Sequence, residues 1–464
     1  MNEEIEYKKI MAQKAFEDNN IPQAVKIYEE LIDEIGLKDQ NLLAKYGQAL
    51  RKNGEPLKFI EVCREYIKKQ KITFNRLNSS LCWCIYDEYI KKYDEDNIDG
   101  FDEFLKEAKY ICDNTKQLKA AEYYKNPYVI TVIKVIQVYN NRNNTNYSKV
   151  LEWLELLNPN ILSEEVYTFT DSKGIQRERA SHKEFYYQNK IKSLEKTFQY
   201  SECYQLCEEC FKEIKKFHYK NDIWIESRKL FCKCMEDQSY IDEYMEFAQK
   251  NNLWHIYKKV SDICFRFNKI EEALIYGSKS ILCSFEYEKM VNLFLSMGQL
   301  FENIGETINA KIMFQASAYY RKRNGWKIPE ELEYEVEKYI LNIDNKPSRK
   351  QIENISMECL KKNDIFKSGK VVKILEGNKS GFIKIESESR DIYFNIRDSK
   401  EKNIRKYMYV DFEIIEIDNK FRAINIRKSE RRNFNGSICK PKRYWYVIRF
   451  IQERKQKICN KIIS

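Results

Sequence analysis

Three cysteines between residues 202 and 215 have a spacing that suits metal ligation. Cys203 is followed by Cys207 and then by Cys210, at steps of four and three residues. Thiolates with such spacing are typical ligands of iron–sulfur clusters when a loop presents them. Here the surrounding pattern predicts a continuous helix, on which these steps place all three thiols on one face. That context favours buried packing residues, and a metal cluster at the three cysteines is the alternative.

The rest of the sequence offers little for catalysis. Its three histidines have no Cys or Glu partner at a metal-binding helical spacing. The chain has neither a phosphate-cradling glycine-rich loop nor a nucleophile elbow. We therefore expect a protein without enzymatic activity and without a bound cofactor. An active site assembled from dispersed acidic residues is the alternative.

Aromatic and basic side chains gather in residues 367–429, where binding chemistry is expected instead. Apolar and polar residues alternate there in five short runs, at 370–375, 381–385, 391–396, 409–417 and 421–426. This period of two is the pattern of half-buried strands. Charged or Asn-containing breaks separate the runs. Five short strands with such breaks suit a small barrel of the oligonucleotide-binding class.

Four motifs in this segment resemble those of a bacterial cold-shock domain. They are Gly369-Lys370-Val371, Gly381-Phe382-Ile383, Asp391-Ile392-Tyr393-Phe394-Asn395 and Ala423-Ile424-Asn425-Ile426. The resemblance covers roughly 60 of the 464 residues and implies a barrel that binds single-stranded RNA or DNA. In that family exposed aromatics stack on successive bases, while Lys and Arg follow the phosphates.

The resemblance implies a set of nucleic-acid-binding residues. Phe382 and Tyr393 are the candidates for base stacking, and Phe394 and Asn395 follow in the same motif. The basic residues expected to contact phosphates are Lys370, Lys373, Lys379, Lys384, Arg397, Lys402, Arg405 and Lys406. A barrel in which the aromatics only fill or cover the interior is the alternative.

Four positions depart from the cold-shock pattern. Lys373 stands where the family has a Trp, Ile374 where it has a Phe, Ser380 where the glycine-rich motif has its first Phe, and Asn395 where it has a His. Each base–aromatic stack contributes about 1–3 kcal/mol. A barrel that keeps two of these rings should therefore bind short single strands weakly and depend on charge.

Residues 1–345 predict a helical solenoid that precedes the barrel. Paired helical patterns recur at roughly 35-residue spacing, most clearly in 5–72 and 254–325. In the second of these regions small Ser261 and Gly298 occupy equivalent positions 37 residues apart. The pattern resembles tetratricopeptide repeats and fades in the middle of the segment. The resemblance implies a concave surface for a protein or peptide partner.

Three other segments complete the predicted organisation. Two polar alternating runs around a turn predict a hairpin inserted at 164–180. Residues 346–366 predict a helical linker with Ser348 as its N-cap. Residues 430–464 form a basic tail in which ten Lys or Arg stand against two Glu among aromatics. That tail suits contact with single-stranded nucleic acid, and a terminal helix packed on the barrel is the alternative.

Composition and charge agree with a mostly α fold that ends in a small all-β barrel. The chain has only 13 Gly and 7 Pro, and 33% of its residues are charged. We expect a cytoplasmic protein, because the most apolar run, 128–139, is interrupted by Lys134 and Gln137. The 14 cysteines are spread through helical segments, so reduced thiols are expected. Residues 346–464 carry 30 Lys and Arg against 15 Asp and Glu, although the whole chain has a net charge of +10. Such asymmetry indicates a nucleic-acid-binding module on a near-neutral scaffold.

Three functions fit these observations. The favoured one is a non-enzymatic protein that binds RNA or single-stranded DNA while its solenoid holds a protein partner. The second is a regulatory solenoid that senses a peptide or protein, with a barrel that has lost nucleic-acid binding. The third is an accessory subunit of a defence or mobile-element nucleic-acid machine. No membrane partner is expected for any of them.

Overall fold

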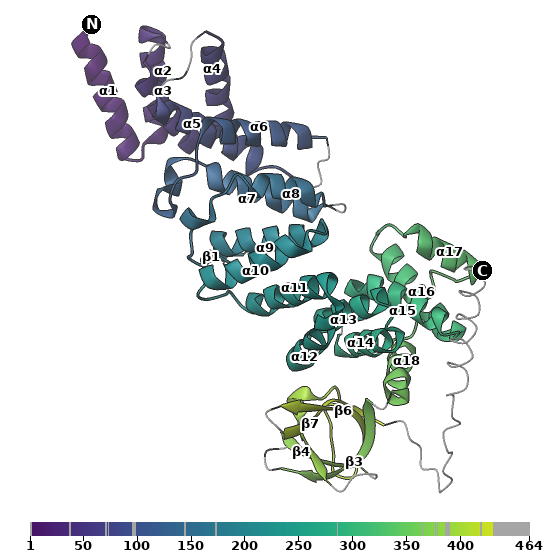
Figure 1. Cartoon of the computed structure of the whole chain (residues 1–464). Helices are drawn as coiled ribbons and strands as arrows, with labels where there is room; N and C mark the ends of the chain where they lie inside the picture. Colours follow the sequence, from purple (N-terminus) through teal and green to yellow (C-terminus); the bar gives the residue numbers. More distant parts are fainter. Residues whose placement is uncertain are drawn as a thin grey trace. The chain divides into compact units, whose positions relative to one another are not determined.

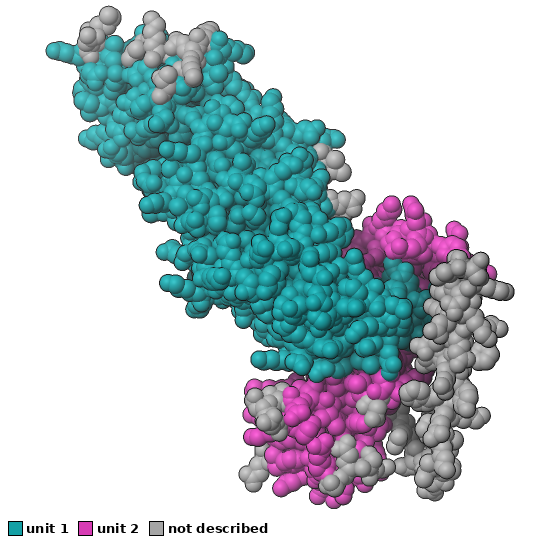
Figure 2. Space-filling view, viewed as in Figure 1, with its two compact units in different colours: residues 1–280, 295–306 teal, residues 281–294, 307–464 magenta. Residues whose placement is uncertain are grey.

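The computed structural model describes most of the chain up to residue 429. The described ranges are 2–36, 39–69, 72, 74–94, 99–142, 145–171, 174–284, 286–363, 365–375, 377, 379–385, 390–417 and 420–429. The predicted basic tail, 430–464, lies outside them. Figure 2 colours two compact units, Met1–Ser280 with Leu295–Glu306 and Ile281–Phe294 with Thr307–Ser464. No helix within the described ranges has the length and apolar character needed to cross a bilayer.

The first unit consists mainly of α-helices, and consecutive helices pack against each other (Figure 1). This arrangement confirms the predicted α-solenoid. Two helices, α14 (Ile270–Cys283) and α15 (Val291–Asn303), belong in part to each unit. The helices wholly in the first unit are α1 (Asn2–Glu17), α2 (Ile21–Ile35), α3 (Gln40–Asn53), α4 (Pro56–Lys69), α5 (Asn75–Ile85), α6 (Phe101–Asn114), α7 (Tyr128–Asn141), α8 (Tyr147–Leu154), α9 (His182–Lys196), α10 (Tyr200–Glu213), α11 (Asn221–Glu236), α12 (Ile241–Asn251) and α13 (Trp254–Arg266).

Small residues let neighbouring helices of this unit approach closely. A side chain at Gly47 on α3 would place its first carbon 2.4 Å from the ring of Phe59 on α4, which is fully buried. On α13 the Ser261 hydroxyl donates a hydrogen bond of 2.7 Å to the carbonyl oxygen of Ala273 on α14. Both contacts need a small residue on the first helix of the pair, because a larger side chain would separate the two backbones.

A two-stranded hairpin lies between α8 and α9, within the segment where the sequence predicts one. Strand β1 (Tyr167–Thr170) pairs antiparallel with β2 (Gln176–Arg179). Between them, the Asp171 backbone N–H donates to the Ile175 carbonyl oxygen at 2.9 Å. The β2 side chains are all exposed, so the hairpin contributes little to the core of the solenoid.

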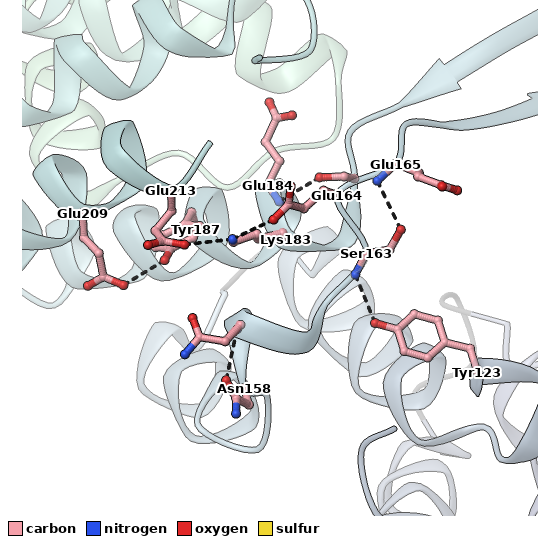
Figure 3. Close-up of polar contacts among 12 residues, drawn as sticks. Tyr123, Asn158, Ser163, Glu164, Glu165, Lys183, Glu184, Tyr187, Glu209 and Glu213 are labelled. Carbon is pink, nitrogen blue, oxygen red and sulfur yellow. Dashed lines mark hydrogen bonds and ion pairs between the residues drawn. The ribbon is translucent and has the colours of Figure 1, made fainter. Parts of the chain in front are cut away.

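The ion pairs of one buried lysine hold the base of this hairpin to the helices that follow it. Figure 3 shows Lys183 between Glu164 and Glu213, with its ammonium 2.9 Å from a carboxylate oxygen of each. The Lys183 side chain is only 6% exposed. One turn further along α9, the Tyr187 hydroxyl donates to Glu209 at 2.8 Å. Because every charge in this network meets an opposite charge or a donor, we read it as structural.

The second unit contains helices and a closed barrel of five strands. The strand order β3-β4-β5-β7-β6 closes on itself, and only the β5–β7 pair is parallel. Because the fourth strand returns beside the first, the barrel is a Greek key, the architecture of oligonucleotide-binding barrels. The predicted all-β barrel is confirmed. The elements are α16 (Thr307–Arg323), α17 (Glu330–Lys338), α18 (Arg349–Lys362), β3 (Phe366–Ile374), β4 (Ser380–Ile385), β5 (Asp391–Asn395), β6 (Tyr409–Ile417) and β7 (Lys420–Lys428).

A glycine lets the first two strands close over the barrel core. A side chain at Gly381 would place its first carbon 2.3 Å from the carbonyl oxygen of Lys373 and 2.8 Å from the ring of Phe394. Backbone and core ring leave no room there, so only glycine fits. The core also contains Val371 and Phe412, both fully buried. This packing fixes β3 against β4 and determines which side chains face outward.

Candidate nucleic-acid interface

The outer surface of β3, β4 and β5 brings the two predicted stacking residues together. Phe382 lies opposite Tyr393 in the strand register, and the two rings meet edge to face with centroids 5.8 Å apart. Lys373 lies opposite Phe382, and Arg422 of β7 lies opposite Tyr393. Lys373, Phe382, Tyr393 and Arg422 thus form one cross-strand series, which we call the aromatic row.

Strand alternation and one bulge produce the aromatic row. Because successive side chains of a strand point to opposite faces, buried Ile383 leaves Phe382 on the outside of the barrel. In β3 the register shifts between Val371 and Lys373. An extra residue at such a bulge re-aims the side chains that follow it. As a result Lys370 and Lys373 both lie on the outer surface, although a step of three positions would place them on opposite faces of a regular strand.

A second series of outward residues runs beside the aromatic row. The strand register places Tyr409, Lys370, Lys384 and Asp391 opposite one another in that order. The Lys370 ammonium lies 5.2 Å from the ring centre of Tyr407 and 5.4 Å from that of Tyr409. Such contacts contribute about 0.5–1 kcal/mol at exposed sites. The surface therefore combines aromatic rings with an excess of cations, and we call these two series the open face.

The remaining predicted residues lie around the open face rather than in it. Asn395 accepts a hydrogen bond of 2.9 Å from the backbone N–H of Arg397, so its side chain caps a short turn, Ile396–Asp398. The other predicted cations are exposed on the segments that flank the strands: Lys379, Arg397, Lys402, Arg405 and Lys406.

Phe394 does not belong to the open face. It is completely buried, and its ring packs in the barrel core. Alternation explains this position, because an outward Tyr393 requires an inward neighbour. The prediction that Phe394 contacts nucleic acid is therefore wrong.

Three residues in or beside the open face were not predicted from the sequence. Arg422 completes the aromatic row, and the rings of Tyr407 and Tyr409 form cation–π contacts with the Lys370 ammonium. Tyr407 is 61% exposed. Alternation in 421–426 is the signal that places Arg422 outward. Its position beside Tyr393 follows only from the parallel pairing of β5 with β7, which no local pattern shows.

Helices of the same unit cover the other side of the barrel, on β6 and β7. Asp411 is 2% exposed and accepts from the ammonium of Lys361 on α18 at 2.6 Å. Arg427 donates to Glu353 of α18 at 2.8 Å and to the carbonyl oxygen of Leu282 at 3.0 Å. We call this surface, Asp411 and Arg427 with their partners, the docked face.

The three cysteines with metal-like spacing lie on α10. Cys203, Cys207 and Cys210 are fully buried, and the Cys203 thiol donates to the carbonyl oxygen of Ile191 at 3.3 Å. Burial raises the pKa of Cys210 to about 12, which opposes the thiolate that a metal requires. In the part of the chain that the structure describes, no group of His, Cys, Asp or Glu is arranged to hold a metal ion.

A groove of about 1300 Å³ lies in the first unit, between α3, α5 and residues 113–126. Side-chain amides and charged side chains line the groove, and the cations outnumber the carboxylates. The Arg51 guanidinium lies 4.2 Å from the ring centre of Trp83 and pairs with Asp87. The other cations of the lining are Lys52, Arg76, Lys116 and Lys125, and its amides are Gln48, Asn75, Asn78, Asn114 and Asn126.

No protein-family model and no curated protein sequence matches the chain. Among solved structures, the C-terminal part of a TPR repeat-containing protein from Cytophaga hutchinsonii is 8% identical, with a TM-score of 0.28 over 70% of this chain and 97% of that one. The human IFIT1 dimer with m7Gppp-AAAA is 9% identical, with a TM-score of 0.29 over 77% and 89%. The TPR2AB domain of yeast Sti1 in complex with pHSP90 is 12% identical, with a TM-score of 0.20 over 77% and 99%. At these scores the likenesses carry no argument about function.

Proposed function

We propose that this protein binds single-stranded RNA or DNA through the open face of its barrel, without catalysing a reaction. The observation that supports the proposal most is the aromatic row, in which Phe382 and Tyr393 stand side by side between Lys373 and Arg422. Neighbouring rings offer stacking surfaces to successive bases, and the flanking Lys373 is placed to meet a phosphate.

Charge should supply a large share of the affinity. Each phosphate of a single strand that a cation neutralises contributes about −0.7 to the slope of log affinity against log salt. Lys370, Lys373 and Lys384 lie on the open face, while Arg422 is already paired with Asp398. Three phosphate contacts would give a slope of about −2. Binding should therefore be moderate in strength and sensitive to salt.

We propose further that the groove of the first unit holds an extended acidic segment of a protein partner. Its excess of cations favours acidic side chains. The amide nitrogens of Asn78, Asn114 and Asn126 each donate one hydrogen bond to a main-chain oxygen of the chain, which leaves each a second N–H for an extended backbone. The ring of Trp83 is already covered by Arg51. That leaves it poorly placed to stack on a base, so a peptide suits the groove better than a nucleic acid.

Fluorescence anisotropy of labelled single-stranded oligonucleotides against the full chain, at two salt concentrations, tests the nucleic-acid proposal. Replacing Phe382 and Tyr393 together by Ala removes both stacks. We expect affinity to fall at least about thirtyfold, since two stacks are worth about 2 kcal/mol or more. Tyr334→Ala is the matched control, because Tyr334 is 63% exposed on α17 of the same unit. Unchanged affinity in the double variant, or an affinity that does not change with salt concentration, would contradict the proposal.

A regulatory solenoid with a silent barrel is the second candidate, and the groove is the observation that favours it. The same protein preparation distinguishes the two functions. Thermal stabilisation by an acidic peptide, with no oligonucleotide binding at low salt, would assign function to the solenoid. Oligonucleotide binding that the double variant abolishes would assign it to the barrel.

A further inference from the structure

A buried carboxylate in the first unit is shared by two cations from different helices. Glu195 lies near the end of α9, and Arg228 of α11 and Lys259 of α13 both pair with its Oε2 oxygen. The Lys259 ammonium is 2.7 Å from that oxygen. The side chains of Glu195, Arg228 and Lys259 are only 4%, 8% and 22% exposed. One carboxylate cannot neutralise two cations, so the site keeps an excess of positive charge.

A third cation, Lys192, adds to this excess. It lies one turn before Glu195 on α9 and is half-buried. Its ammonium donates to the neutral amide oxygen of Asn140 at 3.2 Å and lies 5.5 Å from the ring centre of Tyr147. Neither partner carries a negative charge. Helices α9 and α13 both pack against α11, so the three cations come from adjoining helices.

The cations raise one another's electrostatic energy. Burial, together with the charge of Arg228, lowers the pKa of Lys192 and lowers that of Lys259 to about 8. Lys196 acts in the same direction on both lysines, and Glu195 is the only one of these groups that opposes the effect. Burial and the charge of Lys259 also lower the pKa of His255, which precedes Lys259 by one turn, and this favours the neutral imidazole, which adds no further positive charge. A negative ligand would relieve this repulsion.

An unpaired donor points to the same conclusion independently. Arg228 is 7% exposed, and its Nε is buried without a hydrogen-bond acceptor among the described residues. Its guanidinium lies 4.0 Å from the ring centre of Trp224, so the aromatic side chain covers one face of the guanidinium plane. Guanidinium donors lie in that plane and match the oxygens of phosphate. A buried N–H without an acceptor is costly unless a ligand supplies one.

We propose that Lys192, Arg228 and Lys259 form a binding site for a phosphate-class oxyanion among helices α9, α11 and α13. The class follows from charge and geometry, because the three cations exceed Glu195 by two charges and a phosphate monoester is a dianion near neutral pH. The planar donors of Arg228 fix the orientation of the ligand, and the two ammonium groups supply charge. The phosphate can be free or be carried by a phosphorylated partner. This site is separate from the barrel and does not depend on nucleic-acid binding there.

Acylation of lysines in the full chain at pH 8, quantified residue by residue by mass spectrometry, tests the site. About half of Lys259 is neutral at that pH, whereas ordinary lysines are almost wholly charged. Bound phosphate stabilises the charged form, so we expect acylation of Lys259 to fall about fivefold, the loss that a tenfold rise in proton affinity produces. Lys258 is the internal control, because it pairs with Asp262 and does not contact Glu195. Sodium chloride at equal ionic strength controls for screening.

The variant Lys192→Met distinguishes an anion-binding site from a cluster whose ion pairs are only structural. Lys192 makes no hydrogen bond to Glu195, so the Arg228 and Lys259 pairs with that carboxylate remain and the fold should be retained. We expect the variant to keep reactive Lys259 and to lose its protection by inorganic phosphate. Protection that survives in the variant, or phosphate that protects no better than chloride, would overturn the proposal.

A second pair of ligands distinguishes the sources of the phosphate. A short phosphoserine peptide and its unphosphorylated twin are compared in the same acylation assay. Protection by the phosphopeptide below the concentration needed for inorganic phosphate indicates a phosphorylated partner, and the reverse order indicates a free anion. Equal protection by both peptides would mean that the phosphoryl group is not recognised, which contradicts the proposal.

Discussion

The two faces of the barrel use charged residues in opposite ways. On the docked face, buried Asp411 meets Lys361, and Arg427 meets Glu353 together with a main-chain carbonyl at the end of α14. On the open face, Lys370 lies over tyrosine rings and Lys373 is exposed. Burying a charge is costly unless it is paired, whereas an exposed cation keeps its hydration until a ligand arrives. The docked face thus attaches the barrel to the helices of its unit, whereas the open face presents cations to solvent, as the proposed nucleic-acid binding requires.

Basic residues of the barrel also donate hydrogen bonds to the C-terminal end of a helix. Arg427 and Lys400 donate to the carbonyl oxygens of Leu282 and Cys283 at the end of α14, at 3.0 and 3.2 Å. The last carbonyls of a helix have no partner within it and attract positive charge. Arg427 and Lys400 of the barrel are therefore engaged in attachment, whereas cations of the open face and its flanks, such as Lys373 and Lys379, are exposed.

The largest expected effect comes from breaking the docked face. Asp411→Ala removes the acceptor of Lys361, Ser368 and Ser429, and we expect it to lower the free energy of unfolding by about 3 kcal/mol. Urea unfolding measures the change. Asp391→Ala is the matched control on the open face, where the exposed carboxylate should matter by less than about 0.5 kcal/mol. Equal losses in the two variants would remove the distinction between the faces.

A smaller effect is expected for a single cation of the open face. Lys373→Met should change stability by less than about 0.5 kcal/mol, because the side chain is exposed. It should reduce the salt slope of oligonucleotide binding by about 0.7, the contribution of one phosphate contact. Lys361→Met should lower the stability and leave the salt slope unchanged, since that lysine pairs with Asp411 on the docked face. A slope unchanged by Lys373→Met would mean that Lys373 contacts no phosphate.

Much of the barrel could be predicted from the sequence because strand alternation is a local signal. The run at 409–417 coincides with β6, and the run at 391–396 ends one residue after β5. The resemblance placed Phe382 and Tyr393 together, and their register shows them as direct neighbours. Alternation alone also excludes Phe394 from the surface, a consequence that motif matching overlooked.

The docked face and the anion site could not be predicted, because their residues are far apart in the chain. Arg427 and Leu282 are separated by 145 residues, and Lys259 and Glu195 by 64. No periodicity within a helix or strand reports such a contact. The sequence does show the excess of basic residues in the C-terminal part of the chain. It does not show which of them contact helices and which face solvent, because that depends on which side of the barrel the helices cover.

Photo-cross-linking of a single-stranded oligonucleotide that contains 5-iodouracil tests the central claim most directly. Mass spectrometry of the full chain then locates the cross-linked residues. We predict cross-links at Phe382 or Tyr393, with further ones at the exposed Tyr407 and Tyr409, that disappear at high salt. Specific cross-links that map only to residues outside β3, β4, β5 and these two tyrosines would contradict the account.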